Sequence, residues 1–410
     1  MIRGGYGLIY TTNTGGTVLG SGPQASTSVY LGSPAAAPNT PPPGGTLDNP
    51  FVSGYLDPPN YLVGQGIGDP FRPGTLPYLQ DRTLSVERSL TGNTVLTVAY
   101  AGSRGEHLWY TLPRNVASIS ALSYGPQLYQ QVPNPYAGKL SGSLGAPTIP
   151  FSQTLLPFPQ YTGVNWNRDP VGDSYYDAMT VQLQHRDRHG LYYQVAYTLS
   201  KEIDDINERY NGRGGTIIDP NNLGMTRGLA EYDRPHFLNI NYIYQLPFGP
   251  GHRVLGSGLV SRIVANWQIA GVTSYGSGLP IVITAPGSTY LPGIGAVADR
   301  LHDPHLKHGQ NPEDWFDATA YGVPAPFTVG TGNRIEPDLR GPAYGQWDMG
   351  LARRQSFERG VSLELRFDAV NVFNNRQLSP PNGGVTGGTF AQITASGQAR
   401  SGQVKARLTW

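Results

Sequence analysis

Three histidines form the group of residues in this sequence that most resembles a chemical site. In "LHDPHLKHGQ", His302, His305 and His308 recur at every third position, with Asp303 beside the first of them. Imidazole nitrogens and a carboxylate are suitable ligands for a transition metal. Pro304 and the nearby glycine are typical of an irregular loop, in which nothing fixes the geometry of three imidazoles. We therefore expect a solvated loop here in preference to a metal site.

An acidic pair gives a second candidate for metal binding. In "KEIDDINER", Asp204 and Asp205 follow shortly after Glu202. Two carboxylates with loop carbonyl groups could bind a calcium ion. The same residues also suit a plain junction where a strand enters a loop, and the sequence leaves both interpretations open.

Motifs for catalysis are missing from the sequence. It contains no G-x-S-x-G elbow, no H-E-x-x-H pair and no phosphate-binding loop. It also contains no cysteine, which excludes a disulfide framework and a thiolate metal site. We therefore expect no enzyme activity and no cofactor.

The composition favours rigid strands joined by long loops. Only 14% of the 410 residues are charged, and the net charge of +1 gives no reason to expect a nucleic-acid partner. The 54 glycines and 36 prolines indicate extensive loops, whereas 25 tyrosines provide rings with one apolar and one polar end. No apolar run is long enough for a transmembrane helix.

Strict alternation of apolar and polar residues predicts long β-strands. Met179, Val181 and Leu183 share one face, and after a turn at His189-Gly190 the apolar face resumes at Leu191. Repetition of this pattern predicts ten strands, at about 3–10, 81–90, 94–102, 175–188, 191–200, 234–246, 261–277, 346–357, 360–370 and 401–410.

Long and short connections alternate between these strands. An even strand number with this alternation is typical of an antiparallel transmembrane β-barrel, with both chain ends on the periplasmic side. A soluble β-sandwich also alternates, but its strands average about 5–6 residues, whereas a strand that crosses a bilayer needs about 9–11. A β-propeller would need a fixed repeat, and none is present. The expected fold class is therefore an all-β outer-membrane barrel.

Five stretches resemble the C-terminal barrel half of TonB-dependent outer-membrane receptors of the Oar-like group. They are "LYYQVAYTLSKEIDD", "EYDRPHFLNINYIYQLPFG", "NWQIAGVTSYGSGLPIVI", "LRGPAYGQWDMGLARRQSF" and "LELRFDAVNVFNN". The resemblance covers roughly 175–410, and more weakly 1–110. It implies a barrel of about 22 strands with an N-terminal plug, which imports a bulky nutrient with energy relayed by TonB.

The beginning of the chain departs from that family. "MIRGGYGLIY" shows no signal peptide, TonB box or plug, and resembles a strand from the middle of a family barrel. We expect residues 1–410 to be the C-terminal portion of a barrel in the outer membrane of a Gram-negative-type bacterium, with plug and regulatory domain absent. As such a fragment the chain would be incompetent for export and energised transport, and TonB would be a partner of the full-length protein only. A standalone ten-stranded barrel is the alternative.

Aromatic residues on the apolar faces are expected to meet lipid. The predicted girdle at the membrane interface consists of Tyr193, Tyr197, Tyr242, Tyr244 and Trp267. Trp410 stands where the resemblance implies a terminal aromatic residue that the barrel-assembly machinery reads. Two other functions stay open: an extracellular binding or adhesion β-domain, and an outer-membrane barrel enzyme.

Overall fold

Ten long strands that follow one another in a single antiparallel sheet define the architecture. The computed structural model describes residues 1–10, 63–64, 66–69, 75–140, 142–187, 190–205, 217–250, 254–255, 257–357, 360–397 and 399–410. In spatial order the strands are β1 (Ile2–Tyr10), β3 (Tyr78–Thr91), β4 (Thr94–Pro113), β7 (Gly163–Arg186), β8 (Leu191–Asp204), β10 (His236–Gln245), β11 (Trp267–Gly276), β14 (Tyr344–Ser356), β15 (Ser362–Val370) and β16 (Ser401–Thr409). The prediction of ten antiparallel strands is confirmed.

Short elements occupy the connections and the margins of this sheet. β2 (Gly66–Asp69) pairs in parallel with β7, and β9 (Gly228–Leu229) pairs with β8. The remaining elements are the strands β5 (Gln131–Pro133), β6 (Thr148–Pro150), β12 (Asp299–Arg300) and β13 (Tyr321–Gly322), the helices α1 (Phe151–Thr154) and α2 (Gly258–Val264), and the 3-10 helices η2 (Ile119–Tyr129), η3 (Gly142–Gly145), η4 (Leu223–Met225) and η5 (Ala318–Ala320). None of the helices described is both long and apolar enough to cross a membrane.

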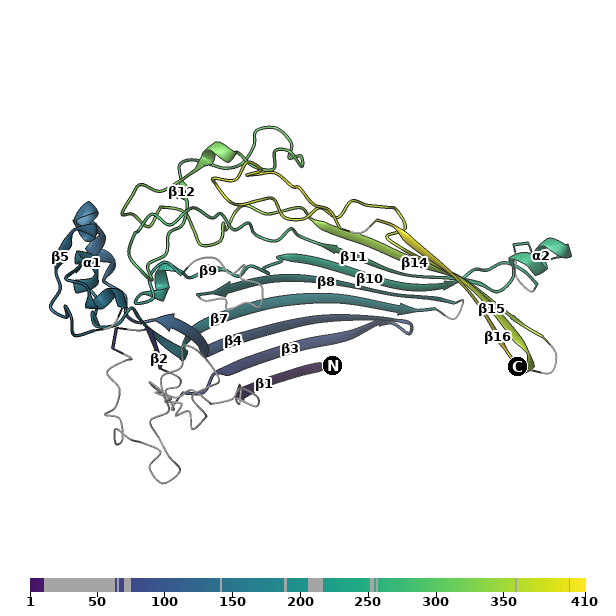
Figure 1. Ribbon diagram of the computed structural model, residues 1–410. Helices are drawn as coiled ribbons and strands as arrows, with labels where there is room; N and C mark the ends of the chain where they lie inside the picture. Colours follow the sequence, from purple (N-terminus) through teal and green to yellow (C-terminus); the bar gives the residue numbers. More distant parts are fainter. Residues whose placement is uncertain are drawn as a thin grey trace, which may run out of the picture.

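The connections are segregated by length. Figure 1 shows the strands side by side in one curved sheet, with the long connections at its left and the short ones, together with both chain ends, toward its right. We call these the loop end and the turn end. The short connections are 92–93, 187–190, 246–266 and 357–361, and each joins two neighbouring strands. This is the predicted long-short alternation.

One predicted strand begins later than the sequence suggested. The expected strand at 261–277 starts at Trp267, and the preceding residues form helix α2 instead. The error has a physical cause, because Leu259, Val260 and Ile263 follow a helical spacing, which the β-branched side chains of Val260 and Ile263 obscured. Asn266 then takes a left-handed conformation (φ +61°) and turns the chain into β11.

Two strands are much longer than the alternation indicated. β4 continues to Pro113 and β7 starts at Gly163, so the two pair with one another far beyond the predicted bounds of 102 and 175. Their register shifts near Leu108 and Leu112. Such irregularities break the period-two pattern of apolar and polar residues. The alternation in the sequence therefore did not predict these strand extensions.

The register places the alternating side chains on two continuous faces. Val86, Val98 and Val181 are direct neighbours across β3, β4 and β7, and the row continues through Tyr197 to Leu238. The apolar face contains Leu84, Val86, Val98, Val181, Leu183, Val195, Leu238, Ile240, Ile269, Leu351, Leu365, Phe367, Val404 and Leu408. The polar face contains Gln182, Gln194, Asn239, Asn241, Ser274, Gln346, Asp348, Arg366, Asp368, Lys405 and Arg407.

A glycine closes the hairpin between β7 and β8 at the turn end. Gly190 has φ +88°, and a Cβ atom there would lie 2.8 Å from Cβ of Gln245. Both the left-handed backbone and this close approach require glycine. The predicted turn therefore holds at Gly190, whereas His189 lies outside the described residues.

The two faces can be separated by cysteine labelling, because the chain has no cysteine of its own. Val195 belongs to the apolar face and its neighbour Gln194 to the polar face. In protein reconstituted into lipid, we expect a charged water-soluble maleimide to label Gln194→Cys quickly and Val195→Cys much more slowly. The Leu183→Cys and Gln182→Cys pair repeats the comparison on β7. Equal labelling rates within both pairs would contradict a lipid-facing apolar face.

Candidate functional site

Hydrophobic cores lie in the connections at the loop end instead of within the sheet. One core unites residues from the connections 277–343 and 371–400: Ile281, Ile283, Ala298, Phe316, Ala320, Tyr321, Leu339 and Ala391. A second unites residues from 114–162 and 277–343: Val116, Ala117, Ala121, Leu128, Leu156, Leu291 and Ile294. These long connections are therefore packed structures that can hold side chains in fixed positions at the loop end.

A buried arginine attaches this packed layer to the sheet. The guanidinium of Arg334, which is 4% exposed, donates to the carboxylate of Asp204 at the end of β8. It also donates from Nε to the carbonyl of Thr226, at 2.9 Å. Because one planar guanidinium group bonds to a strand end and to a neighbouring connection, it fixes these two segments relative to one another.

Two further arginines also bridge separate segments at the loop end. Arg340 pairs with the buried carboxylate of Asp233 and donates to the carbonyl of Gly278, at 3.2 Å. Arg114, at the end of β4, pairs with Asp169 of β7 and donates to the carbonyl of Pro220. Sequence analysis identified none of these arginines, since no local pattern pairs residues that are 55 to 130 positions apart.

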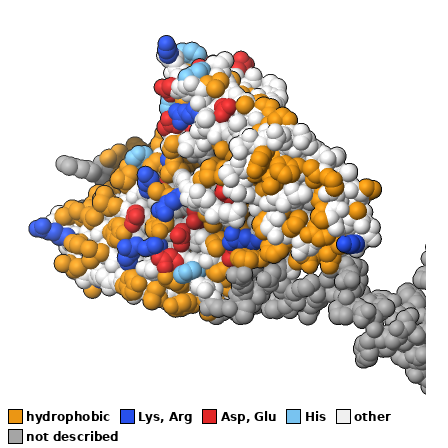
Figure 2. All heavy atoms as spheres, turned by 90° about the vertical axis from the view of Figure 1, so that its left-hand side faces the viewer, with side chains coloured by type: hydrophobic (Ala, Val, Ile, Leu, Met, Phe, Trp, Pro, Cys, Tyr) orange, Lys and Arg blue, Asp and Glu red, His pale blue; other side chains and the backbone are white. Residues whose placement is uncertain are grey.

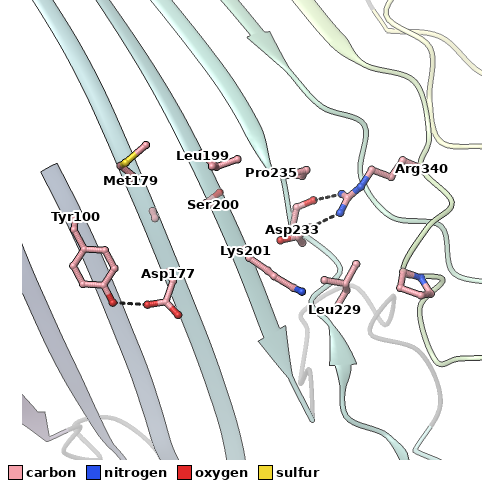
Figure 3. Close-up of a pocket in the computed structure, with 12 residues that line it drawn as sticks. Tyr100, Asp177, Met179, Leu199, Ser200, Lys201, Leu229, Asp233, Pro235 and Arg340 are labelled. Carbon is pink, nitrogen blue, oxygen red and sulfur yellow. Dashed lines mark hydrogen bonds and ion pairs between the residues drawn. The ribbon is translucent and has the colours of Figure 1, made fainter. Parts of the chain in front are cut away.

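A pocket of about 580 Å³ lies where the strands meet the loop-end connections. Figure 3 shows Tyr100, Asp177 and Met179 on adjacent strands, with Lys201 pointing toward Leu229 and Asp233 bonded to Arg340. Met179 and Leu199 are direct neighbours on the apolar face, and Asp177 lies opposite Lys201 one step nearer the loop end. The pocket thus marks the boundary at which the apolar face gives way to charged residues.

The polar groups of this pocket favour binding over proton transfer. The Asp177 carboxylate accepts the Tyr100 hydroxyl at 2.5 Å. Asp233 accepts from Arg340 and, at 2.8 Å, from the main-chain N–H of Glu202. What the pocket offers a ligand is therefore the Lys201 ammonium above an apolar wall, which suits an amphipathic anion.

Charged side chains gather on the loop end as a whole. Figure 2 shows this end toward the viewer, with basic, acidic and histidine side chains interspersed near its middle and apolar side chains beside them. A surface of both signs over packed connections is suited to recognising a polar molecule from the water phase.

The three histidines of the candidate metal site pair with three different carboxylates. His305 Nδ1 lies 2.6 Å from Asp303 Oδ1, His308 Nε2 lies 3.4 Å from Asp314 Oδ2, and His302 Nδ1 lies 3.9 Å from Asp317 Oδ2. Within the described residues no three His, Cys, Asp or Glu side chains are gathered so that they could hold a metal ion.

The two aspartates of the candidate calcium site point to different partners. Asp204 pairs with Arg334, whereas Asp205 accepts the main-chain N–H of Asp173 at 2.8 Å. Burial is the main reason why the pKa of Asp205 is raised. The structure uses this junction to connect β8 with β7 and with the packed connections.

Another buried carboxylate lies within the loop-end connections. Glu336 is fully buried, and its pKa is raised by burial although Arg300 donates to it at 2.8 Å. Burial and the nearby Glu336 also raise the pKa of the Tyr321 hydroxyl. Arg300 bridges Glu336 and Asp338, so this cluster ties together residues of the loop-end connections.

The five predicted girdle rings all lie on the apolar face. Tyr193 is opposite Tyr242, Tyr197 is opposite Leu238, Tyr244 is opposite Ile269, and Trp267 is opposite Arg353. Four of the five stand toward the turn end, and Tyr197 stands closer to the loop end, where its hydroxyl lies 2.7 Å from His236 Nδ1. Trp410 follows β16 directly and is 89% exposed.

Removing the Arg334 side chain should strongly destabilise the loop end. Arg334→Ala leaves the Asp204 carboxylate buried without its cation, which typically costs about 3–5 kcal/mol. We expect denaturant unfolding to report that loss, together with faster proteolysis within residues 277–343. The control is Arg3→Ala, because Arg3 pairs with Glu87 at an exposed site, where the loss should stay within about 1 kcal/mol. Equal stabilities of the two variants would contradict the anchoring role.

The His305–Asp303 pair should make part of the loop end sensitive to pH. The hydrogen bond to Asp303 raises the pKa of His305, and the same bond lowers the pKa of Asp303. The pair therefore stabilises the fold below the unfolded histidine pKa of about 6.5, and this contribution is lost as pH rises through the raised folded pKa. It is also lost in acid, as pH falls through the lowered folded pKa of Asp303.

Titration of the histidine ring by NMR checks this assignment. Asp303→Asn should lower the pKa of His305 toward its ordinary value, whereas Asp314→Asn should leave it unchanged. An unaltered His305 titration in Asp303→Asn would show that the pairing is not formed in solution.

Comparison with solved structures gives distant similarities to outer-membrane proteins. The outer membrane transporter YddB from Escherichia coli aligns with a TM-score of 0.43 at 9% identity, covering 85% of this chain and 34% of that one. FpvA of P. aeruginosa, solved with heterologous pyoverdines, gives 0.32 at 10% identity, with 81% and 27% covered. The ferric-catecholate import receptor Fiu from E. coli K12 gives 0.21 at 11% identity, with 82% and 44% covered. The chain thus spans less than half the length of each.

The comparison by sequence decides the family. None of the curated proteins compared matches this chain. The model of the family described as "Outer membrane beta barrel domain" matches residues 1–403, which include nine of the ten sheet strands in full and the start of β16. With nearly its whole length matched, this chain belongs to the family of outer membrane beta barrel domains.

Proposed function

We propose that this chain is the C-terminal portion of the barrel of a TonB-dependent outer-membrane receptor of the Oar-like group, which takes up a bulky nutrient. The observation that carries the proposal is the register, which gives ten consecutive antiparallel strands one continuous apolar face and one continuous polar face. The family and the order of the five sequence stretches add support. The proposal assigns no catalysis to the chain.

In this proposal the two faces have different surroundings. The apolar face meets the lipid of the outer membrane, with the five aromatic rings at its interfaces. The polar face lines a lumen, where Arg366 bonds to Asp368 at 2.8 Å and Asn239 bonds to Ser274 at 2.9 Å. The packed connections at the loop end would receive the nutrient from outside the cell.

The remaining parts of such a receptor lie outside these 410 residues in this proposal. Strands that complete a barrel of about 22 would pair with the edges β1 and β16, and a plug would fill the lumen. TonB would be a partner of that complete receptor. Trp410 would serve the barrel-assembly machinery as the terminal aromatic residue.

Paired cysteines at the two edges of the sheet test this proposal. The chain is exported behind a signal peptide, and we expect it in the outer-membrane fraction with a heat-modifiable mobility. We then expect no intramolecular disulfide between a cysteine at Tyr6 in β1 and one at Val404, Ala406 or Leu408 in β16, because further strands belong between them.

The matched control is a cysteine pair at Tyr6 and Arg82, which are direct neighbours on β1 and β3 and should form a disulfide. A disulfide between β1 and β16 of one chain would replace the proposal with a standalone ten-stranded barrel. Recovery of the chain as a soluble monomer without detergent would contradict a membrane barrel altogether.

A further inference from the structure

We infer that the turn end of the apolar face carries a binding site for one anionic phospholipid of the periplasmic leaflet, between helix α2 and strands β14 and β15. This inference rests on the proposed function, because it requires that the apolar face meets lipid. It begins from helix α2, which stands at the turn end of the sheet (Figure 1).

Helix α2 presents apolar side chains to its surroundings. Leu259 is 79% exposed, Ile263 is 63% exposed and Val260 is 54% exposed. These side chains would be costly to leave in water, whereas a short helix with an apolar surface is stable at a membrane interface.

Two side chains of the apolar face attach the last turn of α2 to the sheet. Trp267 Nε1 donates a hydrogen bond to the carbonyl of Ile263 at 3.0 Å. Arg353 Nη2 donates a hydrogen bond to the carbonyl of Arg262 at 2.6 Å. Trp267 and Arg353 are direct neighbours across β11 and β14. The last turn of the helix is therefore bonded to side chains of the lipid-facing surface.

A pocket of about 660 Å³ lies between this turn and the sheet. Leu363, Leu365, Phe248 and Phe357 form its apolar lining, and Arg262 and Arg353 bring cations to it. Leu365 is opposite Arg353, and Leu363 is the next residue toward the turn end on the same face. Apolar walls with two guanidinium groups match a molecule that joins acyl chains to a phosphate.

Arg353 differs from the arginines of the loop end in lacking an anionic partner among the residues that the structure describes. Arg334, Arg340 and Arg114 each pair with a carboxylate. In the described part of the chain no carboxylate pairs with Arg353 or Arg262, and Arg353 Nε is buried without a hydrogen-bond acceptor. A buried guanidinium donor requires a partner, and a phosphodiester accepts from guanidinium groups in a fork geometry.

The position of the pocket indicates the membrane leaflet from which the lipid would come. It lies at the turn end, which in the proposed orientation is the periplasmic side of the membrane. A lipid phosphate at that level would lie beside Arg353 and Arg262, while its acyl chains follow the apolar face past Leu363 and Leu365. An anionic headgroup is favoured over a zwitterionic one because two cations stand together.

Native mass spectrometry of the full chain measures this site. Protein extracted from bilayers that mix phosphatidylglycerol with phosphatidylcholine should retain one phosphatidylglycerol in preference to phosphatidylcholine. Arg353→Gln should reduce that retention about tenfold, the effect of losing one charge-assisted hydrogen bond. The matched control is Arg354→Gln, because Arg354 is the next residue of β14 and faces Glu364 on the polar side; it should retain the lipid like the wild type.

A second variant and a competition experiment complete the test of the lipid site. Arg262→Gln changes an exposed helix residue and should also weaken retention, so it serves if Arg353→Gln fails to fold. Inorganic phosphate should not displace the lipid, and full displacement by it would assign the pocket to a small anion and overturn the inference.

The results separate this inference from the proposed function. Insertion with a heat-modifiable mobility but unchanged retention in Arg353→Gln and Arg262→Gln would overturn the lipid site alone. Equal losses in Arg353→Gln and Arg354→Gln would also overturn it, because they would reflect net charge only. Failure of the wild-type chain to enter bilayers would overturn both.

Discussion

The register of ten antiparallel strands assigns the side chains of the sheet to an apolar face or to a polar face. Side chains alternate strictly along a strand, so a slip of one residue in any strand would move its whole apolar set to the polar face. Val86, Val98 and Val181 stay in one row because β3 and β4 form a hairpin and β4 pairs with β7 in a matching register, although a long connection joins β4 to β7. Gly190 illustrates how this is achieved, since its left-handed backbone sets the pairing of β7 with β8. The positions of the apolar side chains, the aromatic rings and the polar side chains all follow from that pairing.

Burial is distributed differently from that of a soluble β-protein. The sheet contributes few fully buried side chains, and both hydrophobic cores lie in connections at the loop end. A sheet with one face in lipid needs no protein layer over its apolar side. The connections instead supply their own packing; Arg334 and Arg114 join them to strands, and Arg340 joins two connections to one another. The loop end thereby acquires a defined shape.

The arginine side chains at the two ends of the sheet have different partners. At the loop end, buried guanidinium groups find carboxylates within the protein. At the turn end, Arg353 bonds only to a carbonyl of α2 and a glutamine oxygen, among described residues. The first arrangement stabilises the protein from within, whereas the second leaves capacity for an anion from outside. The pocket between α2 and the sheet places these guanidinium groups beside an apolar surface.

The sequence by itself determined the ten strands, their alternating faces and the separation of long from short connections, because period-two patterning and turn residues are local properties. It located the aromatic rings on the apolar face for the same reason. Only the tertiary structure decided that Asp204 belongs to Arg334, that the three histidines take separate carboxylates, and that α2 is a helix bonded to Trp267 and Arg353. Those contacts join residues far apart in the chain or depend on bulges and side-chain geometry, and no local pattern encodes such pairings.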